Sequence, residues 1–117
     1  MRAFPGEFYF KLTSFGNLLG EFTNRCETGM CTESSVPLAG EQATGNFTGT
    51  YNTTWYDAES GEADHAVLII AKEKRKVANR YKLVWTNRNG DEIRFHGYGF
   101  VCNEMLIGHY VDGEPKE

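Results

Sequence analysis

Hydrophobic and polar residues alternate over short runs along most of the chain, which is typical of β-strands with one covered face. The clearest run covers residues 46–56, where Phe47, Gly49, Tyr51 and Trp55 share one face and mainly threonines occupy the other. No stretch keeps a helical period of apolar residues for three turns. We predict the remaining strands over residues 7–13, 18–25, 65–71 and 80–87, with two more within 91–111.

Residues 91–111 are predicted to form the hairpin that determines the register of the other strands. A two-residue turn at Asn103-Glu104 places Cys102 opposite Met105 and, further out, Tyr98 opposite His109. We take as interior the face that combines glycines with apolar residues, which are Ile93, Phe95, Gly97, Gly99, Val101, Leu106, Gly108 and Tyr110. Glycines in a strand let a large ring lie against the backbone, or let the sheet curl sharply.

The loop Arg88-Asn89-Gly90 leaves two registers open for the strand over residues 80–87. A two-residue Asn-Gly turn would place Trp85 opposite Arg94. A three-residue loop, with Gly90 in the left-handed conformation, keeps the large apolar side chains on one face, and we adopt it. The predicted pairs are then Tyr81 with Gly97, Leu83 with Phe95, and Trp85 with Ile93.

Residues 26–45 interrupt the strand pattern. This run is polar and rich in glycine, serine and threonine, with one island at Val36-Pro37-Leu38. A loop of this length is uncommon in a compact domain and often serves as a lid or binding loop. We expect it to cross one end of a barrel, with at most one short strand near residues 36–38. The charged tail over residues 112–117 is expected to be frayed.

Length and composition favour one all-β domain over residues 1–117. Aromatic residues make up 14% of the chain and 13 glycines are present, with turn residues between short strands. We predict a single antiparallel meander or barrel of about seven to eight strands. The net charge of −4 gives no reason to expect nucleic acid as a partner. Six basic residues fall within 72–82, which we interpret as a solvated hairpin end rather than an anion site.

No apolar run is long enough to span a membrane, and the first ten residues lack the apolar core of a secretory signal. The odd number of cysteines suits a reducing compartment. A cytoplasmic location is therefore expected, unless a signal has been removed. The spacing from Cys26 to Cys31 differs from that of zinc knuckles, and no nucleotide or hydrolase fingerprint occurs. We predict neither a metal nor a cofactor.

One succession of motifs resembles a known group of barrels. It runs from Phe47-Thr48-Gly49-Thr50-Tyr51 and Trp55 through Val67-Leu68-Ile69-Ile70, Tyr81-x-Leu83-x-Trp85 and Gly97-x-Gly99 to Leu106 and Tyr110. This rhythm is similar to that of calycin-type barrels, the avidin-like (streptavidin-like) and lipocalin-like proteins, over roughly residues 46–111. The first strand and most positions that hold biotin in avidins differ here. The resemblance implies a closed or nearly closed antiparallel barrel that can hold one small ligand, and it does not imply biotin binding.

Three classes of function remain, and we favour the first, a non-enzymatic barrel that binds a small apolar or aromatic molecule in its interior. Its candidate ligand-binding residues are Tyr51, Trp55, Tyr81, Trp85, Phe95 and Tyr110. The second class is a homodimer or partner-binding module that uses the outer face of the 91–111 hairpin, with Phe100, Met105, Ile107 and Val111. The third is an enzyme with acid–base groups among Arg94, His96, Tyr98 and His109, although these residues could equally form ordinary cross-strand pairs.

Overall fold

The computed structural model describes residues 6–24, 31–38, 46–57, 61–73 and 80–115. These residues form eight β-strands, and the described part contains no helix. The strands are β1 (Gly6–Leu12), β2 (Leu18–Asn24), β3 (Cys31–Pro37), β4 (Gly49–Asp57), β5 (Glu62–Lys72), β6 (Arg80–Thr86), β7 (Ile93–Cys102) and β8 (Met105–Asp112). Nor do the described ranges include a helix with the length and apolarity needed to cross a membrane.

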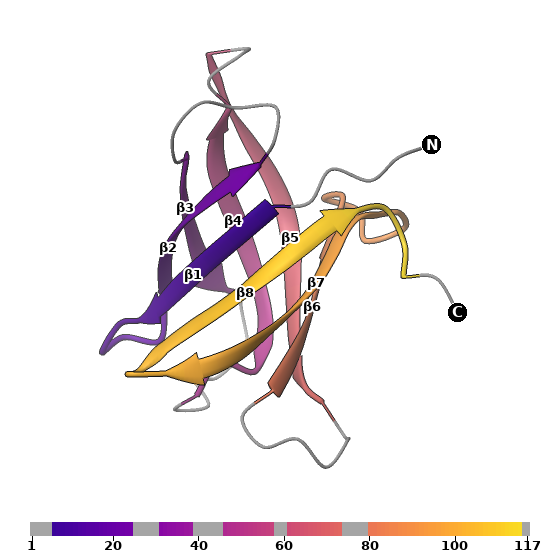
Figure 1. The fold of residues 1–117 in the computed structure, drawn as a ribbon. Helices are drawn as coiled ribbons and strands as arrows, with labels where there is room; N and C mark the ends of the chain where they lie inside the picture. The colour runs from indigo at the N-terminus through magenta and orange to yellow at the C-terminus, as the bar shows by residue number, and fades with distance from the viewer. Residues whose placement is uncertain (1–5, 25–30, 39–45, 58–60, 74–79, 116–117) are drawn as a thin grey trace.

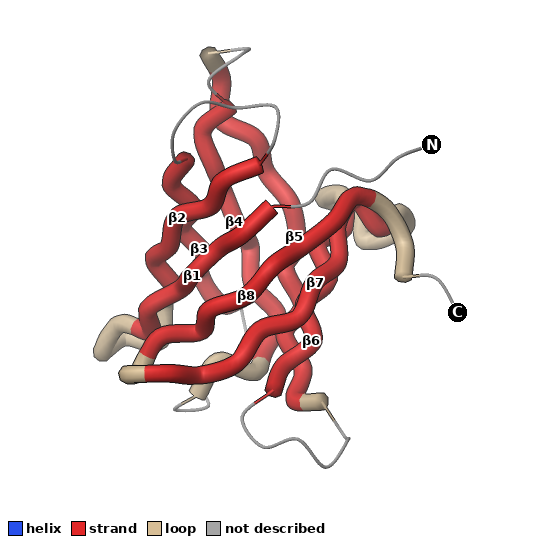
Figure 2. The backbone as a smooth tube through the Cα atoms, viewed as in Figure 1, coloured by secondary structure: helices blue, strands red, loops and turns tan. Residues whose placement is uncertain are grey.

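The eight strands close into one antiparallel barrel, as predicted. Each strand pairs with the next along the chain, and β8 pairs with β1 to complete the circle (Figures 1 and 2). Gly6 lies opposite Tyr110 in this closing pair, and Phe10 lies opposite Leu106. Closure gives each of the eight strands two neighbours, but β5 extends beyond the end of β6, so its residues 62–66 pair with β4 alone.

The terminal hairpin has the predicted register. Cys102 pairs with Met105, and Tyr98 pairs with His109. Asn103 and Glu104 both have positive φ angles, of 51° and 66°, as a two-residue type I′ turn requires. The inward face is the predicted one, because Leu106 and Tyr110 are buried in the core.

One glycine explains how the ring of Tyr110 fits inside the barrel. A Cβ atom added at Gly6 would overlap both the Tyr110 ring and the carbonyl oxygen of Thr23. The ring therefore lies directly against the β1 backbone, and the Tyr110 hydroxyl donates a 3.0 Å hydrogen bond to the Thr23 carbonyl oxygen. Gly6 is not among the hairpin glycines for which we predict such a ring. Of those, Gly108 has one against it, because an added Cβ atom would lie 2.9 Å from Cζ of Phe8.

The predicted register between β6 and β7 is wrong by two residues. Leu83 pairs with Gly97, and Trp85 pairs with Phe95, because the pairing shifts between Trp85 and Thr86. The connection is also longer than three residues: the Asn87 amide donates to the Glu92 carbonyl oxygen at 2.9 Å. A shift of two residues leaves every side chain on its original face. Trp85 is therefore buried beside Phe95, as predicted.

The prediction of one long loop over residues 26–45 is wrong in its centre. Strand β3 occupies Cys31–Pro37, earlier and longer than the short strand expected near residues 36–38. Its inward residues are the polar Glu33 and Ser35, both buried. Residues 26–30 and 39–45 lie outside the described part of the chain.

The beginning of the predicted frayed tail is attached to the barrel. Asp112 belongs to β8, and the Gly113 amide donates a 2.7 Å hydrogen bond to the Arg94 carbonyl oxygen. Residues 116–117 lie outside the described part of the chain.

The two ends of the barrel are filled differently. At one end Phe47 is buried against Tyr81, and the Tyr51 hydroxyl donates to the Phe47 carbonyl oxygen at 2.9 Å. We call the other end the mouth; there β2, β4 and β6 finish and β5 and β7 begin, toward the top of Figure 1. Three aromatic residues that pack on the core near the mouth remain partly exposed, whereas several aliphatic residues deeper inside are fully buried. The three are Phe22, Trp55 and Phe95. Inward-facing aromatic rings therefore meet solvent at the mouth.

Candidate ligand-binding site

Four aromatic rings form a closed circuit across the mouth, which we call the aromatic quartet. Its members are Phe22 on β2, Trp55 on β4, Phe95 on β7 and Tyr110 on β8. In that order around the circuit, neighbouring ring centroids lie 6.3, 6.0, 5.7 and 6.2 Å apart, with interplanar angles from 71° to 86°. All four contacts are T-shaped, so that the electropositive edge of one ring meets the electronegative face of the other, which is a favourable packing of aromatic side chains.

A second layer lies behind the quartet. The ring of Trp85 is 5.8 Å from that of Tyr110 and 6.5 Å from that of Phe95, and Phe8 packs edge-on against it at 5.7 Å. Four of the six predicted ligand-binding residues therefore meet at the mouth. The other two, Tyr51 and Tyr81, lie toward the opposite end beside Phe47. At the mouth the predicted residues pack mainly on one another.

A buried carboxyl group adjoins these rings. Glu33 on β3 is opposite Trp55 on β4 and is only 5% exposed. Its Oε2 atom accepts hydrogen bonds from Thr53 Oγ1 at 2.5 Å and from Trp85 Nε1 at 3.0 Å. Ser35 supports the arrangement by donating its hydroxyl to Thr53 Oγ1 at 2.7 Å. Four side chains from β3, β4 and β6 thus form one polar network inside an otherwise apolar barrel.

Burial changes the acidity of this carboxyl group. Removal from water penalises the charged form and raises the pKa of Glu33 from 4.5 to about 7, even though the hydrogen bonds from Thr53 and Trp85 act in the opposite direction. Glu33 therefore titrates near neutral pH. A buried acid with a strongly shifted pKa beside a partly exposed interior surface is a common feature of functional sites.

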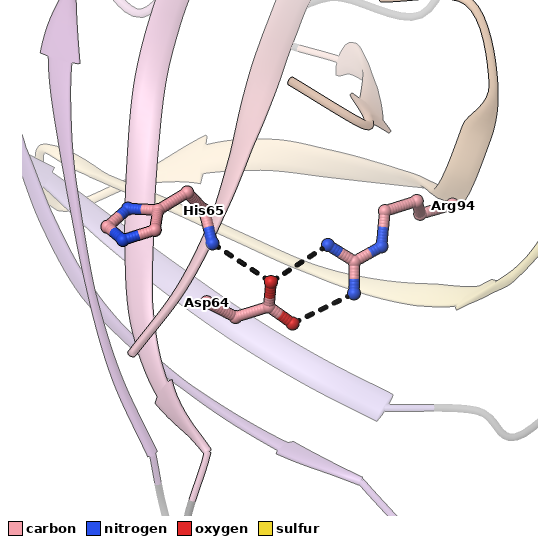
Figure 3. Close-up of polar contacts among 3 residues, drawn as sticks. All are labelled: Asp64, His65 and Arg94. Carbon is pink, nitrogen blue, oxygen red and sulfur yellow. Dashed lines mark hydrogen bonds and ion pairs between the residues drawn. The ribbon is translucent and has the colours of Figure 1, made fainter. Parts of the chain in front are cut away.

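An ion pair lies at the rim of the mouth (Figure 3). The Arg94 guanidinium binds both carboxylate oxygens of Asp64, at 3.2 and 2.9 Å, and the His65 amide donates to Asp64 Oδ1 at 2.9 Å. The His65 ring itself points away from the pair. Because Asp64 is on β5 and Arg94 is on β7, the pair spans the end of the strand between them, β6.

The same guanidinium covers part of the quartet. Its Cζ atom lies 5.2 Å from the centre of the Trp55 ring and 5.5 Å from that of Phe95. These are cation–π distances. The hydrogen bonds from Arg94 hold the pKa of Asp64 below its usual value, so Asp64 is a carboxylate at neutral pH. Trp55 therefore has an acid on each neighbouring strand, Glu33 on β3 and Asp64 on β5, and a cation over its face.

The predicted polar row does not gather into one site. Tyr98 is opposite His109, but Arg94 turns toward Asp64, and the Nδ1–H of His96 donates to the Gly113 carbonyl oxygen at 2.7 Å. The row's members thus make separate contacts. No group of three or more histidine, cysteine or acidic side chains capable of holding a metal ion occurs within the described ranges.

Sequence reasoning missed Glu33, Asp64 and Phe22 as members of the site. The number of predicted strands could have pointed to the strand that carries Glu33. Neighbours in an all-antiparallel barrel alternate in direction, so only an even number of strands can close. Seven clear strands therefore required an eighth, and the long polar segment before residue 46 was the place for it.

Comparison with known proteins does not assign this chain to a family. A scan against models of protein families, a search of curated proteins and a search of solved structures each found no match. The fold and the site together define a small closed antiparallel β-barrel with an aromatic mouth, an ion pair at its rim and a buried acid behind it.

Proposed function

We propose that this protein is a non-enzymatic binding barrel that takes a small apolar or aromatic ligand at its mouth, against the aromatic quartet. The observation that carries the proposal is the partial exposure of the inward-facing rings of Phe22, Trp55 and Phe95, at one end of a barrel whose middle is filled by buried side chains. Concave aromatic surfaces with a few placed polar groups are the usual form of small-ligand sites. The resemblance of the strand rhythm to calycin-type barrels supports the same function.

The packing of the quartet bears on how such a ligand would bind. A ligand lying flat on the rings and covering about 150 Å² of apolar surface would gain about 4 kcal/mol, which corresponds to a Kd near millimolar before any cost of association. Neighbouring rings are already in contact, at centroid distances near 6 Å. Tighter binding therefore requires one of the three partly exposed rings, Phe22, Trp55 or Phe95, to turn and admit the ligand.

The proposal is tested with a naphthalene-type probe, 1-naphthalenemethanol, in a titration followed by amide NMR. We expect the largest shifts at Phe22, Trp55, Phe95 and Tyr110, and at the indole N–H of Trp85. Phe95→Ala should weaken binding, whereas Phe100→Ala should not. Phe100 is a matched control because it is an aromatic residue of the same strand that faces outward and is 52% exposed. Shifts confined to the outer surface, or equal effects of the two variants, would contradict binding at the mouth.

A second candidate function is self-association or partner binding through the outer face of the β7–β8 hairpin. Phe100 is among the most exposed large apolar side chains of the described residues, and Ile107 is its cross-strand partner. An outer groove beside them runs between β1 and β8, lined by Tyr9, Lys11 and Met105 among others. Contiguous apolar surface of this kind is typical of protein contacts.

A further inference from the structure

We propose that the ligand of the mouth is a small organic cation, an ammonium or guanidinium group on an apolar body, bound at Trp55 between the carboxyl groups of Glu33 and Asp64. This inference rests on the proposed function, because it concerns the same mouth, and it specifies the chemical class of the ligand. The guanidinium of Arg94 lies over the same rings that would hold the ligand's cation.

The arrangement around Trp55 is the first support. Three adjacent strands place Glu33, Trp55 and Asp64 side by side in register, so that an indole ring has an acidic residue on each side. Two of the other three quartet members, Phe22 and Phe95, pack their rings edge-to-face against this indole. Several aromatic faces combined with carboxyl groups form the kind of cage that binds alkylated ammonium ions.

The second support is that the site already holds a cation from its own chain. The Arg94 guanidinium lies over both the Trp55 and Phe95 rings and is bound by two oxygens of Asp64. The side chains of Arg94 and Asp64 are 30% and 36% exposed, so water competes for this pair. Partial exposure weakens the attraction within this pair, and an incoming ligand cation can therefore compete with Arg94 for Asp64 and for the rings.

The third support is the charge balance of the buried acid. Thr53 and Trp85 donate neutral hydrogen bonds to Glu33, and within the described residues no lysine or arginine forms an ion pair with it. A buried carboxylate without a counter-charge is unfavourable. Burial accordingly raises its pKa to about 7, and a ligand cation beside Trp55 would provide the missing charge.

An anionic ligand fits the same residues poorly. It would have to displace Asp64 from both nitrogens of Arg94 and then lie beside Glu33. The electronegative faces of the quartet would repel it. The geometry therefore favours a cation, and an anion that bound best would overturn the inference.

The experiment compares three probes that share one ring system and differ in charge. They are 1-naphthylmethylamine, which is cationic, 1-naphthalenemethanol, which is neutral, and 1-naphthoic acid, which is anionic; each is titrated by calorimetry and amide NMR. The wild-type barrel should bind the amine about tenfold more tightly than the alcohol, the preference expected of a partly desolvated cation–π site, and the acid most weakly.

Three isosteric variants test which carboxyl groups cause the preference for the amine over the alcohol. Glu33→Gln and Asp64→Asn should each reduce the ratio of the affinity for the amine to the affinity for the alcohol. Glu7→Gln removes the same formal charge from the outer face of β1, where Glu7 is exposed, and should leave this ratio unchanged.

The outcomes separate this inference from the function on which it rests. If the alcohol and the amine bind at the mouth with equal affinity, the proposal of a cationic ligand is wrong, but the proposal of a ligand-binding site at the mouth is retained. If none of the three probes binds at the mouth, both the cationic ligand and the binding site are ruled out. If a variant fails to fold, the comparison of the three probes on the wild-type protein still decides.

Discussion

The indole nitrogen of Trp85 donates a 3.0 Å hydrogen bond to the carboxyl group of Glu33, which lies 52 positions earlier in the chain. The two residues belong to β6 and β3, which are not neighbours in the barrel. The bond therefore crosses the interior and joins strands that share no backbone pairing. It also connects the second aromatic layer to the acid beside the quartet, so the polarity of the mouth depends on how firmly this pair is held.

Replacing Trp85 tests that connection. Trp85→Ala should destabilise the fold by about 3–5 kcal/mol, because a buried ring is lost and a cavity remains. Trp85→Phe keeps most of the ring but removes the donor to Glu33, and a cost of about 1–3 kcal/mol is expected. Urea denaturation measures both values. Trp85→Phe as stable as the parent would show that the hydrogen bond to Glu33 adds nothing to stability.

The buried acid should also make stability depend on pH. The pKa of Glu33 rises from 4.5 to about 7 on folding, so the folded protein binds this proton more tightly than the unfolded chain. The stabilising contribution is therefore fully present below pH 4.5 and is lost as pH rises to about 7. A shift of this size corresponds to a change on the order of 3 kcal/mol.

Glu33→Gln isolates this contribution from those of other titrating groups. The difference in unfolding free energy between the variant and the parent should move in favour of the variant between pH 5 and pH 7.5 and then level off, because glutamine does not ionise. Denaturant titrations of both proteins across this range measure the difference. A constant difference over the whole range would show that Glu33 keeps an ordinary pKa in the folded barrel.

The terminal hairpin could be derived from sequence because its determinants are local. A two-residue turn at Asn103-Glu104 and a period of two fix every pair from Cys102 outwards. The register of β6 against β7 was missed because it depends on the shift after Trp85 and on a connection stabilised by the Asn87 side chain, which donates to Asp91 at 2.6 Å. Neither feature has a clear signature in the alternation of apolar and polar residues.

The candidate site was harder to predict, because its polar members are satisfied by distant residues. Glu33 reads as a loop residue until Thr53 and Trp85, from other strands, supply its hydrogen bonds. Arg94 was assigned to the outer face by alternation. Near the end of a strand, however, its long side chain reaches the mouth and contacts the Trp55 ring. Closure of the barrel creates both relationships, and no local window of sequence contains them.

The ion pair at the rim should shield the quartet from solvent. In a Trp85→Phe background, Trp55 is the remaining tryptophan and reports on the mouth alone. Arg94→Gln should then increase the quenching of Trp55 fluorescence by acrylamide, because the guanidinium no longer covers the ring. Arg88→Gln is the matched control, since Arg88 is exposed in the connection between β6 and β7. Equal quenching in both variants would mean that Arg94 does not cover the mouth.

Self-association through the outer face of β7 and β8 is the last expectation. Phe100 is 52% exposed and lies opposite Ile107, so a bare patch would form there in a monomer. Burying such a patch against a second copy would remove apolar surface from water. Sedimentation velocity over a wide range of concentrations should show a dimer that Phe100→Glu dissociates. Phe15→Glu, which alters an 87% exposed phenylalanine in the turn between β1 and β2, should leave the dimer intact. A monomer at every concentration, or equal effects of the two variants, would rule out this face as the contact.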